Sequence, residues 1–336
     1  MSILEPNPYI PTLEQLLPVA VALLGTVALP GTVALPDPVS VFDTDSVETQ
    51  PPFDPMDSFF TIDEGLVPIR APHSSLSGTT SLDLSSLDDI LKKISNDANT
   101  RPIRIYEDGG KIGCGGILWI SGKALALYLL QNWDKLMIDL KVNHGIENLN
   151  RIIELGAGTG ITGIALGLFL ESRISKGIDT NTSQDFKIDV TDIPNLVTIM
   201  NQNVELNQIS TIVNARVLSW GEELPQDIQN TGVDLVLAAD CVYHEVLFDI
   251  LRKTLVDLCK VNKLKYPQGS KRETVILMAS RKRRRADVRF FKKAKKCFNM
   301  VEIKDYKEYE EFRNQNIHIL KMTLKDKFYD ELMEIS

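Results

Sequence analysis

Hydrophobic and polar residues follow two alternating periods from about residue 101 to the end of the chain. Short runs rich in β-branched and apolar residues predict strands at 151–155, 187–193, 211–218, 233–239 and 274–279. Apolar residues at helical spacing predict helices at 119–133, 162–170, 196–206, 246–260 and 287–297. Two more strands are expected near Val301 and at 318–323. Strands that alternate with helices in this way predict a doubly wound α/β sheet with right-handed crossovers.

The first hundred residues show neither period. Prolines recur, a GTVALP hexapeptide occurs twice in tandem at 25–36, and residues 36–89 are rich in Ser, Thr, Pro and Asp. Such a segment buries too little apolar surface to offset its ordering entropy. We therefore predict a largely disordered extension at 1–100 and one folded domain at 101–336. The apolar stretch at 16–35 is interrupted by prolines and lacks a basic leader, so we expect no membrane role.

Charge is distributed as unevenly as hydrophobicity. Of the 45 Asp and Glu residues, 14 lie in the first hundred residues, against 3 of the 37 Lys and Arg residues. The net charge of −8 therefore belongs to the extension, and the near-neutral remainder argues against a dedicated nucleic-acid binder. The 4 cysteines form no C-x-x-C pair and the 4 histidines are dispersed. This usage is typical of a reducing cytoplasm and predicts no metal site.

The strand at 151–155 carries Glu154 and leads directly into the glycine-rich run GAGTG at 156–160. Glycines allow a positive φ and close approach of a ligand, while the next helix presents its free N–H groups. Residues 158–163 also match G-x-G-x-x-G, a weak signal on its own. Glu154 would repel a pyrophosphate but not a cationic group, which favours S-adenosylmethionine over NAD. A strand–helix turn without a ligand is the alternative.

Four side chains outside this turn are also candidate site residues. Asp192 ends the second predicted strand, where an acid either binds ribose hydroxyls or caps the next helix. Trp119 and Trp220 stand at element ends and could flank an adenine ring, although a lone tryptophan is more often part of the core. Asp240 follows the fourth strand; it could bind an ammonium group or cap a helix.

Tyr243 lies three residues beyond Asp240, and its ring could flank a cation or pack on the sheet edge. The basic run SRKRRR at 280–285 follows the fifth strand at the same expected edge. A solvated helix face is the usual explanation of such a run. Alternatively, it could steer an acidic protein surface toward the site.

Six stretches between residues 101 and 324 resemble the seven-β-strand protein-lysine methyltransferases of the methyltransferase-16 group, which have a Rossmann-like sheet. They are EDGGKIGCGGILWISG, ELGAGTG, DVTDI, LSWGEEL, VDLVLAADCVYHE and ILMASRKRRRADVRFF. Within that group the chain resembles in particular the fungal enzymes that methylate translation elongation factor 1-alpha. The extension at 1–100 lies outside the resemblance.

The resemblance implies an S-adenosylmethionine site and a channel for the target lysine. The cofactor-binding residues would be Trp119, Glu154, Gly156, Ala157, Gly158, Asp192, Trp220 and Ala239. Asp240 and Tyr243, in a D-x-x-Y pattern, would border the lysine channel. The resemblance also implies an antiparallel hairpin formed by the last two strands.

We therefore expect a cytoplasmic, monomeric protein-lysine N-methyltransferase acting on elongation factor 1-alpha, without stable nucleic-acid or membrane partners. Asp240 would orient the lysine amine and Tyr243 would form a wall of the channel. Three alternatives stay open at this point. They are a methyltransferase of nucleic acids or small molecules, a catalytically silent cofactor-binding module, and an NAD-dependent dehydrogenase.

Overall fold

The computed structural model describes residues 82–95, 102–178, 182–266 and 270–330. The GTVALP repeat and the apolar stretch at 16–35 lie outside the described residues, and so does most of the predicted disordered extension. Across the described ranges, no helix has the length and apolar character needed to cross a membrane.

The described residues form one mixed sheet of seven strands, in the order β3-β2-β1-β4-β5-β7-β6. The strands are β1 Leu149–Leu155, β2 Thr182–Asp192, β3 Val213–Val217, β4 Leu235–Ala239, β5 Val275–Arg281, β6 Phe298–Glu302 and β7 Ile317–Leu324. Strands β1 to β5 are parallel, and β7 runs antiparallel to both β5 and β6. The predicted doubly wound sheet and the C-terminal antiparallel hairpin are therefore confirmed.

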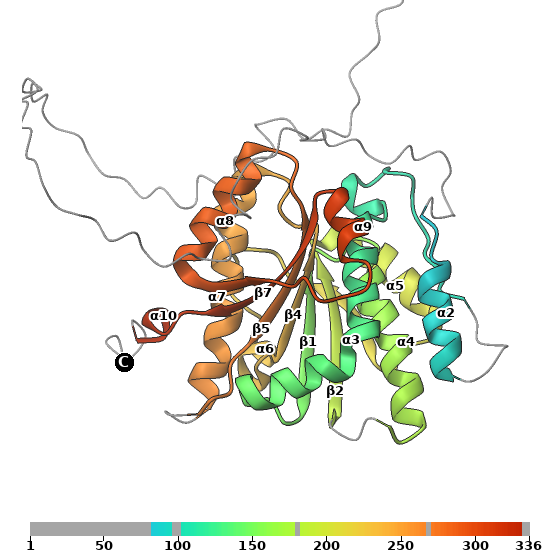
Figure 1. Cartoon of the computed structure of the whole chain (residues 1–336), viewed down its shortest axis with the longest axis horizontal. Coiled ribbons are helices and arrows are strands. Elements are labelled where there is room, and N and C mark those ends of the chain that lie inside the picture. Colours follow the sequence, from blue (N-terminus) through green and yellow to red (C-terminus); the bar gives the residue numbers. More distant parts are fainter. Residues whose placement is uncertain (1–81, 96–101, 179–181, 267–269, 331–336) are drawn as a thin grey trace, which may run out of the picture. The chain divides into compact units, whose positions relative to one another are not determined.

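Helices cover both faces of this sheet (Figure 1). One face carries α2 Ser85–Ser95, α3 Ile120–His144, α4 Ile161–Ser175 and α5 Pro194–Asn207; the other carries α6 Gln226–Thr231, α7 Phe248–Lys265 and α8 Arg285–Cys297. Short elements complete the described chain: η2 Cys114–Gly116, η3 Glu245–Leu247, α9 Tyr309–Asn314 and α10 Lys327–Asp330. Alternate residues of the central strands point into the two cores, as Ile152 and Ile153 of β1 do. Both faces of a parallel strand are buried, which explains the continuous apolar runs in the sequence.

The structure differs from the sequence prediction at two helices. Helix α2 lies within the stretch predicted to be disordered, yet Leu87 and Leu91 are fully or almost fully buried against α3 and α4. The folded domain therefore begins before residue 101. Helix α3 continues to His144, well past the predicted end at 133, with non-helical backbone at Asn132. In the second half of α3, the apolar residues Ile138 and Val142 lie on the exposed side of the helix. Apolar residues there do not follow a single stripe, so their spacing gave no clear helical signal.

Candidate active site

The strand order places a topological switch point between β1 and β4. From β1 the chain winds outward to β2 and β3, and then returns to β4 and continues to β5. The register aligns Leu155 with Thr191 on one side and with Ala238 on the other, while Ala239 pairs with Ala279. The residues that follow these strands therefore emerge together at one edge of the sheet. Open α/β sheets bind their ligands at this position.

The glycine-rich turn after β1 is built from left-handed backbone. Gly156, Gly158 and Gly160 have φ angles of 57°, 55° and 80°. The N–H of Ala157 donates to the carbonyl of Thr191 at 3.0 Å, which ties the turn to β2. A Cβ at Gly158 would lie only 2.8 Å from the carbonyl oxygen of Gly115. The turn thus requires glycine for its conformation and for its contact with the 113–116 loop.

Glu154 points toward the start of α4. Its Oε2 accepts the N–H of Gly163 at 2.8 Å, Thr162 binds it as well, and the residue is only 1% exposed. Burial raises the pKa of this carboxyl to about 7, against the stabilising hydrogen bonds from the helix. The sequence argument had placed its negative charge beside the bound ligand. The structure instead brings the carboxyl to the helix N-terminus, which weakens that argument.

Asp192 joins the glycine-rich turn to the end of β2. Its Oδ2 accepts the N–H of Gly158 at 2.9 Å, and its Oδ1 accepts the N–H of Ile193 at 2.8 Å. Burial raises the pKa of Asp192. Ile193, not Asp192, occupies the N-cap position of α5, so the helix-capping alternative is wrong.

Trp220 packs on the same turn. A Cβ at Gly156 would lie 2.8 Å from Cζ2 of the Trp220 ring and 3.1 Å from Sγ of Cys241. The indole is only half-buried, so part of its surface remains open to solvent beside the turn. An apolar ring in this position offers a flat contact surface for a ligand held by the glycines.

Asp240 has a backbone conformation that is uncommon for a residue other than glycine. Its φ is 58°, and its N–H donates to the carbonyl of Ala279 on β5 at 2.8 Å. Non-glycine residues with positive φ cluster at functional sites. Both carboxylate oxygens are bound by the guanidinium of Arg283, with Nη1 to Oδ1 at 2.7 Å and Nη2 to Oδ2 in contact. The next helices, η3 and α7, have His244 and Leu247 at their N-caps and no capping side chain, so the helix-capping alternative is wrong.

The basic run at 280–285 is largely turned away from solvent, whereas further bases on α8, such as Arg289 and Lys293, lie on an exposed helix face. Lys282 and Arg283 are 7% and 4% exposed. Arg284 donates to the carboxylate of Asp287 at 2.9 Å and to the carbonyl of Tyr243. Within this run, which the structure describes completely, only Arg285 is classed as exposed. Lys282 and Arg283 are buried, while Arg281 and Arg284 are partly buried, and the local charge pattern could not show this difference.

Tyr243 and Trp119 meet the loop that carries Cys114. The indole Nε1 of Trp119 donates to the carbonyl of Cys114 at 2.8 Å, and its ring lies 5.7 Å from the guanidinium carbon of Arg283. The Tyr243 hydroxyl pairs with the side chain of Cys114. Burial and the Cys114 side chain raise the pKa of Tyr243, so the phenol stays neutral. The structure thus brings Trp119, Asp240 and Tyr243 to one side of the edge.

Two buried acids shape the loop before Trp119. Glu107 accepts the N–H of Leu118 at 2.5 Å, and Asp108 accepts the amides of Gly110 and Ile112 at 2.8 and 2.9 Å. These bonds explain the EDGG sequence, because the carboxylates hold a turn whose glycines adopt positive φ. The EDGGKIGCGGILWISG stretch at 107–122 thus begins with a loop that is held by hydrogen bonds from its own two acids.

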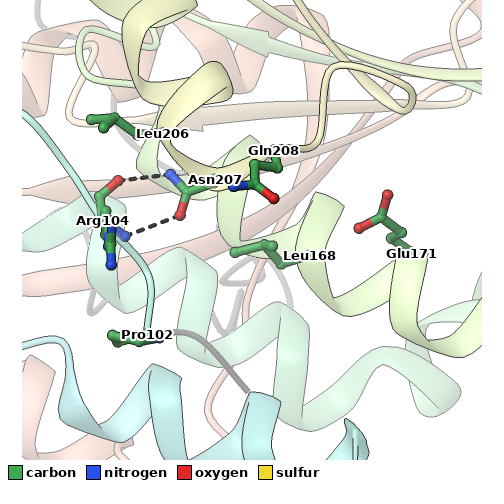
Figure 2. A pocket seen from close by; sticks show the side chains of 7 residues that line it. All are labelled: Pro102, Arg104, Leu168, Glu171, Leu206, Asn207 and Gln208. Atoms are coloured by element: carbon green, nitrogen blue, oxygen red, sulfur yellow. Dashed lines mark hydrogen bonds between the residues drawn. The ribbon is translucent and has the colours of Figure 1, made fainter. Parts of the chain in front are cut away.

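Sequence reasoning missed two asparagines of α5, at 203 and 207, that hold the segment leading into this loop. The side chain of Asn207 donates to the carbonyl of Arg104 at 2.7 Å and accepts its N–H at 3.0 Å (Figure 2). Asn203 makes the same pair with Tyr106 and also donates to the carbonyl of Thr159 at 2.9 Å. Asn203 thereby links the loop to the glycine-rich turn. The sequence signal for this contact is a pair of asparagines one turn apart on a helix, with the spacing needed to pair with alternate residues of an extended segment.

A surface hollow lies away from this edge. Its lining comprises Pro102, Arg104, Leu168, Glu171, Leu206, Asn207 and Gln208 (Figure 2). The last turn of α5 lies about 20 Å along the helix axis from Pro194, where α5 leaves the candidate site. The hollow therefore belongs to the opposite end of the helices and not to the site described above.

Comparison with known proteins agrees with this geometry. Residues 97–297 match the family described as lysine methyltransferase, a range that includes the glycine-rich turn, Asp192, Asp240 and Arg283. The chain belongs to the lysine methyltransferase family. This protein-lysine N-methyltransferase therefore uses S-adenosylmethionine as its methyl donor.

Several curated relatives of this lysine methyltransferase share most of the domain. Protein-lysine N-methyltransferase EFM6 of Saccharomyces cerevisiae is 39% identical over 232 residues, covering 66% of this chain and 86% of the yeast protein. Protein N-lysine methyltransferase METTL21A of Danio rerio is 30% identical over 206 residues, covering 61% and 78%. An O-methyltransferase from Bacillus cereus in complex with SAH aligns with a TM-score of 0.34 at 14% identity, over 73% of this chain and 93% of that one.

The residues at the edge fit S-adenosylmethionine chemically. The turn at 156–160 offers backbone that a side chain would obstruct, and Asp192 supplies acceptor oxygens beside it. Trp220 adds a partly exposed apolar ring. An amino acid head group, ribose hydroxyls and an adenine ring need this set of partners.

Proposed function

We propose that this lysine methyltransferase acts in the cytoplasm on a lysine of translation elongation factor 1-alpha. Two observations support this proposal. Six sequence stretches resemble the fungal enzymes with that substrate, and the yeast protein-lysine N-methyltransferase EFM6 is 39% identical over 86% of its length. The resemblance includes the 107–122 and 280–291 stretches, and the fold brings both of them to the same edge of the sheet.

Within this proposal, the cofactor is held at the β1–β4 switch point. The backbone of Gly156, Ala157 and Gly158 would contact the amino acid part of the cofactor. Glu154 would stabilise the turn through its hydrogen bond to the start of α4. Asp192 would accept the ribose hydroxyls, while Trp220 and Ala239 would contact the adenine. Trp119 contacts Arg283 in this structure, so we place it between the cofactor and the lysine channel.

The bound cofactor supplies an activated methyl group, so the protein must deliver a neutral amine in line with it. An unperturbed lysine titrates near ~10.4, and a channel of low polarity lowers that value because it disfavours the charged form. Asp240 would orient the amine through an oxygen lone pair. The half-buried ring of Tyr243 would form one wall of the channel. Alignment and removal of water then supply much of the rate.

The test is methyl transfer from isotope-labelled S-adenosylmethionine to purified elongation factor 1-alpha that lacks prior methylation. We expect label on a lysine side chain, located by peptide mass spectrometry, and loss of transfer when that lysine is changed to arginine. Bovine serum albumin at the same concentration serves as the unspecific protein control. Label on other proteins of a cell extract but not on the elongation factor would refute the proposed target while leaving the enzyme class intact.

A further inference from the structure

The ion pair between Asp240 and Arg283 is an unusual feature for a site that is expected to receive a cation. The Asp240 and Arg283 side chains are 5% and 4% exposed, and the guanidinium binds both oxygens of the carboxylate. Arg283 is itself held in place, because Asp287 accepts its backbone N–H at 2.9 Å and the Trp119 ring lies 5.7 Å away. This arginine therefore reaches the carboxylate from a fixed position.

Methyl transfer creates a conflict that this ion pair resolves. A carboxylate beside the target lysine favours its ammonium form, yet only the neutral amine has the lone pair that attacks the methyl group. An unpaired Asp240 would therefore raise the pKa of the bound lysine and oppose the reaction. A carboxylate has about four lone-pair sites, and a bidentate guanidinium uses two of them. Asp240 can thus orient an amine while its charge is cancelled by Arg283.

The other charged and titratable groups around this pair come from every neighbouring element. They are Cys114 of η2, Glu154 of β1, Asp192 of β2, Cys241 and Tyr243 after β4, Arg281 of β5, Arg284 at the N-cap of α8, and Asp287 of α8. Burial, followed by the charge of Arg283, lowers the pKa of Arg281. Arg284 is bound to Asp287 and to the Tyr243 carbonyl. The guanidinium of Arg283 is the group that touches Asp240 directly.

We propose that Arg283 is a positioning residue that fixes Asp240 and cancels its charge, so that the target lysine is bound as the free amine. This inference rests on the proposed role of Asp240 beside the lysine. The proposal also means that Arg283 of the basic run acts inside the site, rather than at the surface as an attraction for an acidic protein.

The experiment measures kcat against pH, from about 6.5 to 10, because kcat reports ionisations within the enzyme–substrate complex. The substrate is elongation factor 1-alpha or, if labelling identifies another protein, that protein. In Arg283→Met we expect the acidic limb to move up by about one pH unit, so that kcat near pH 7.5 falls about tenfold and recovers near pH 10. Substrate affinity at pH 7.5, measured by fluorescence anisotropy, should stay equal or tighten, because the uncompensated carboxylate attracts the ammonium.

Three further variants separate charge from structure. Arg283→Lys keeps the positive charge, and its acidic limb should stay at the wild-type position. Arg285→Met removes an equal charge from an exposed site two residues away and should leave the whole profile unchanged. The double variant D240N/R283M removes both charges, so its limb should return to the wild-type position even with a reduced kcat.

Thermal unfolding and the affinity for S-adenosylmethionine, measured by calorimetry, report folding independently of turnover. A loss of kcat in Arg283→Met that is equal at all pH values would overturn the inference, and so would an equal shift in Arg285→Met. If Arg283→Met does not fold, an unshifted limb in Arg283→Lys with a shifted one in Arg283→Gln supports it, and equal limbs in both refute it. Failure of the wild-type enzyme to label any lysine would instead refute the proposed function.

Discussion

Replacing Asn203 by alanine tests how the glycine-rich turn is held. Asn203 is fully buried on α5, and its side chain binds the N–H and carbonyl of Tyr106 at 2.6 and 3.1 Å and the carbonyl of Thr159 at 2.9 Å. The variant leaves these three backbone groups without their partner. An unpaired buried group costs about 1–3 kcal/mol, and the Tyr106 groups, which are only partly buried, belong at the low end. We therefore expect a loss of about 4 kcal/mol in the free energy of unfolding.

The assay combines thermal unfolding with calorimetric titration of S-adenosylmethionine. For a domain of this size a loss of 1 kcal/mol lowers the Tm by about 2–4 °C, so Asn203→Ala should lower it by about 10 °C. Because Asn203 fixes the carbonyl of Thr159 in the turn, the affinity for the cofactor should also fall by about tenfold, equivalent to about 1.4 kcal/mol.

Asn207→Ala is the matched control. Asn207 makes the same two bonds with the backbone of Arg104, but these bonds are exposed; its further bond goes to the carbonyl of Asn203 at 2.7 Å and not to the glycine-rich turn. Water can replace the lost partner there, so we expect a loss of about 1 kcal/mol and unchanged cofactor affinity. Equal losses of stability in the two variants, or a normal cofactor affinity in Asn203→Ala, would refute the reasoning.

Three other predictions follow from the site. Burial raises the Glu154 pKa from 4.5 to about 7, so the protonated carboxyl contributes stability below pH 4.5 that is lost as the pH rises to 7. Urea unfolding should therefore show the free energy of unfolding of Glu154→Gln rising by about 3 kcal/mol relative to wild type between pH 4.5 and 7. A difference that stays constant over this range would contradict the prediction. Gly158→Ala, with a φ of 55° and a Cβ 2.8 Å from the Gly115 carbonyl, should weaken cofactor binding at least about tenfold by calorimetry, whereas unchanged affinity would count against the turn. Asp240→Ala should abolish methyl transfer and, because it leaves Arg283 buried without its partner, lower the free energy of unfolding by about 3–5 kcal/mol. The double variant Asp240→Ala with Arg283→Met should regain stability but not activity. An active double variant would show that Asp240 is not needed for transfer.

The period of the apolar residues was sufficient to predict the central sheet. Strands buried on both faces read as continuous apolar runs, and apolar residues at helical spacing mark the helices between them. The residues at the edge of the sheet were also predictable. The carboxyl ends of parallel strands lie at one edge, so an acid or a glycine directly after such a strand must lie there. Asp192 and the turn at 156–160 were found in this way, and their mutual contact at 2.9 Å follows from the register.

The parts that were not predicted depend on contacts between distant segments. Arg283 and Asp240 are 43 residues apart, and Asn203 and Tyr106 are 97 apart. In the sequence, Arg283 is one base in a basic run and Asn203 is one polar residue on a helix. Helix α2 was missed because the Ser- and Asp-rich composition of the surrounding stretch was given more weight than the helical spacing of its apolar residues, Leu87, Ile90, Leu91 and Ile94, which pack in or against the core. Local composition cannot show which side chains the fold turns inward.

The central claim is that the edge formed by the turn at 156–160 and by Asp240 transfers a methyl group to a protein lysine. The most direct measurement incubates the enzyme with isotope-labelled S-adenosylmethionine and cell extract, divided into samples treated with ribonuclease or with protease, and then identifies the labelled molecule by mass spectrometry. We predict label that survives ribonuclease, disappears with protease and maps to a lysine side chain, and that is absent with Asp240→Ala combined with Arg283→Met. Label on nucleic acid or on a small molecule, or undiminished lysine labelling by that double variant, would contradict the account.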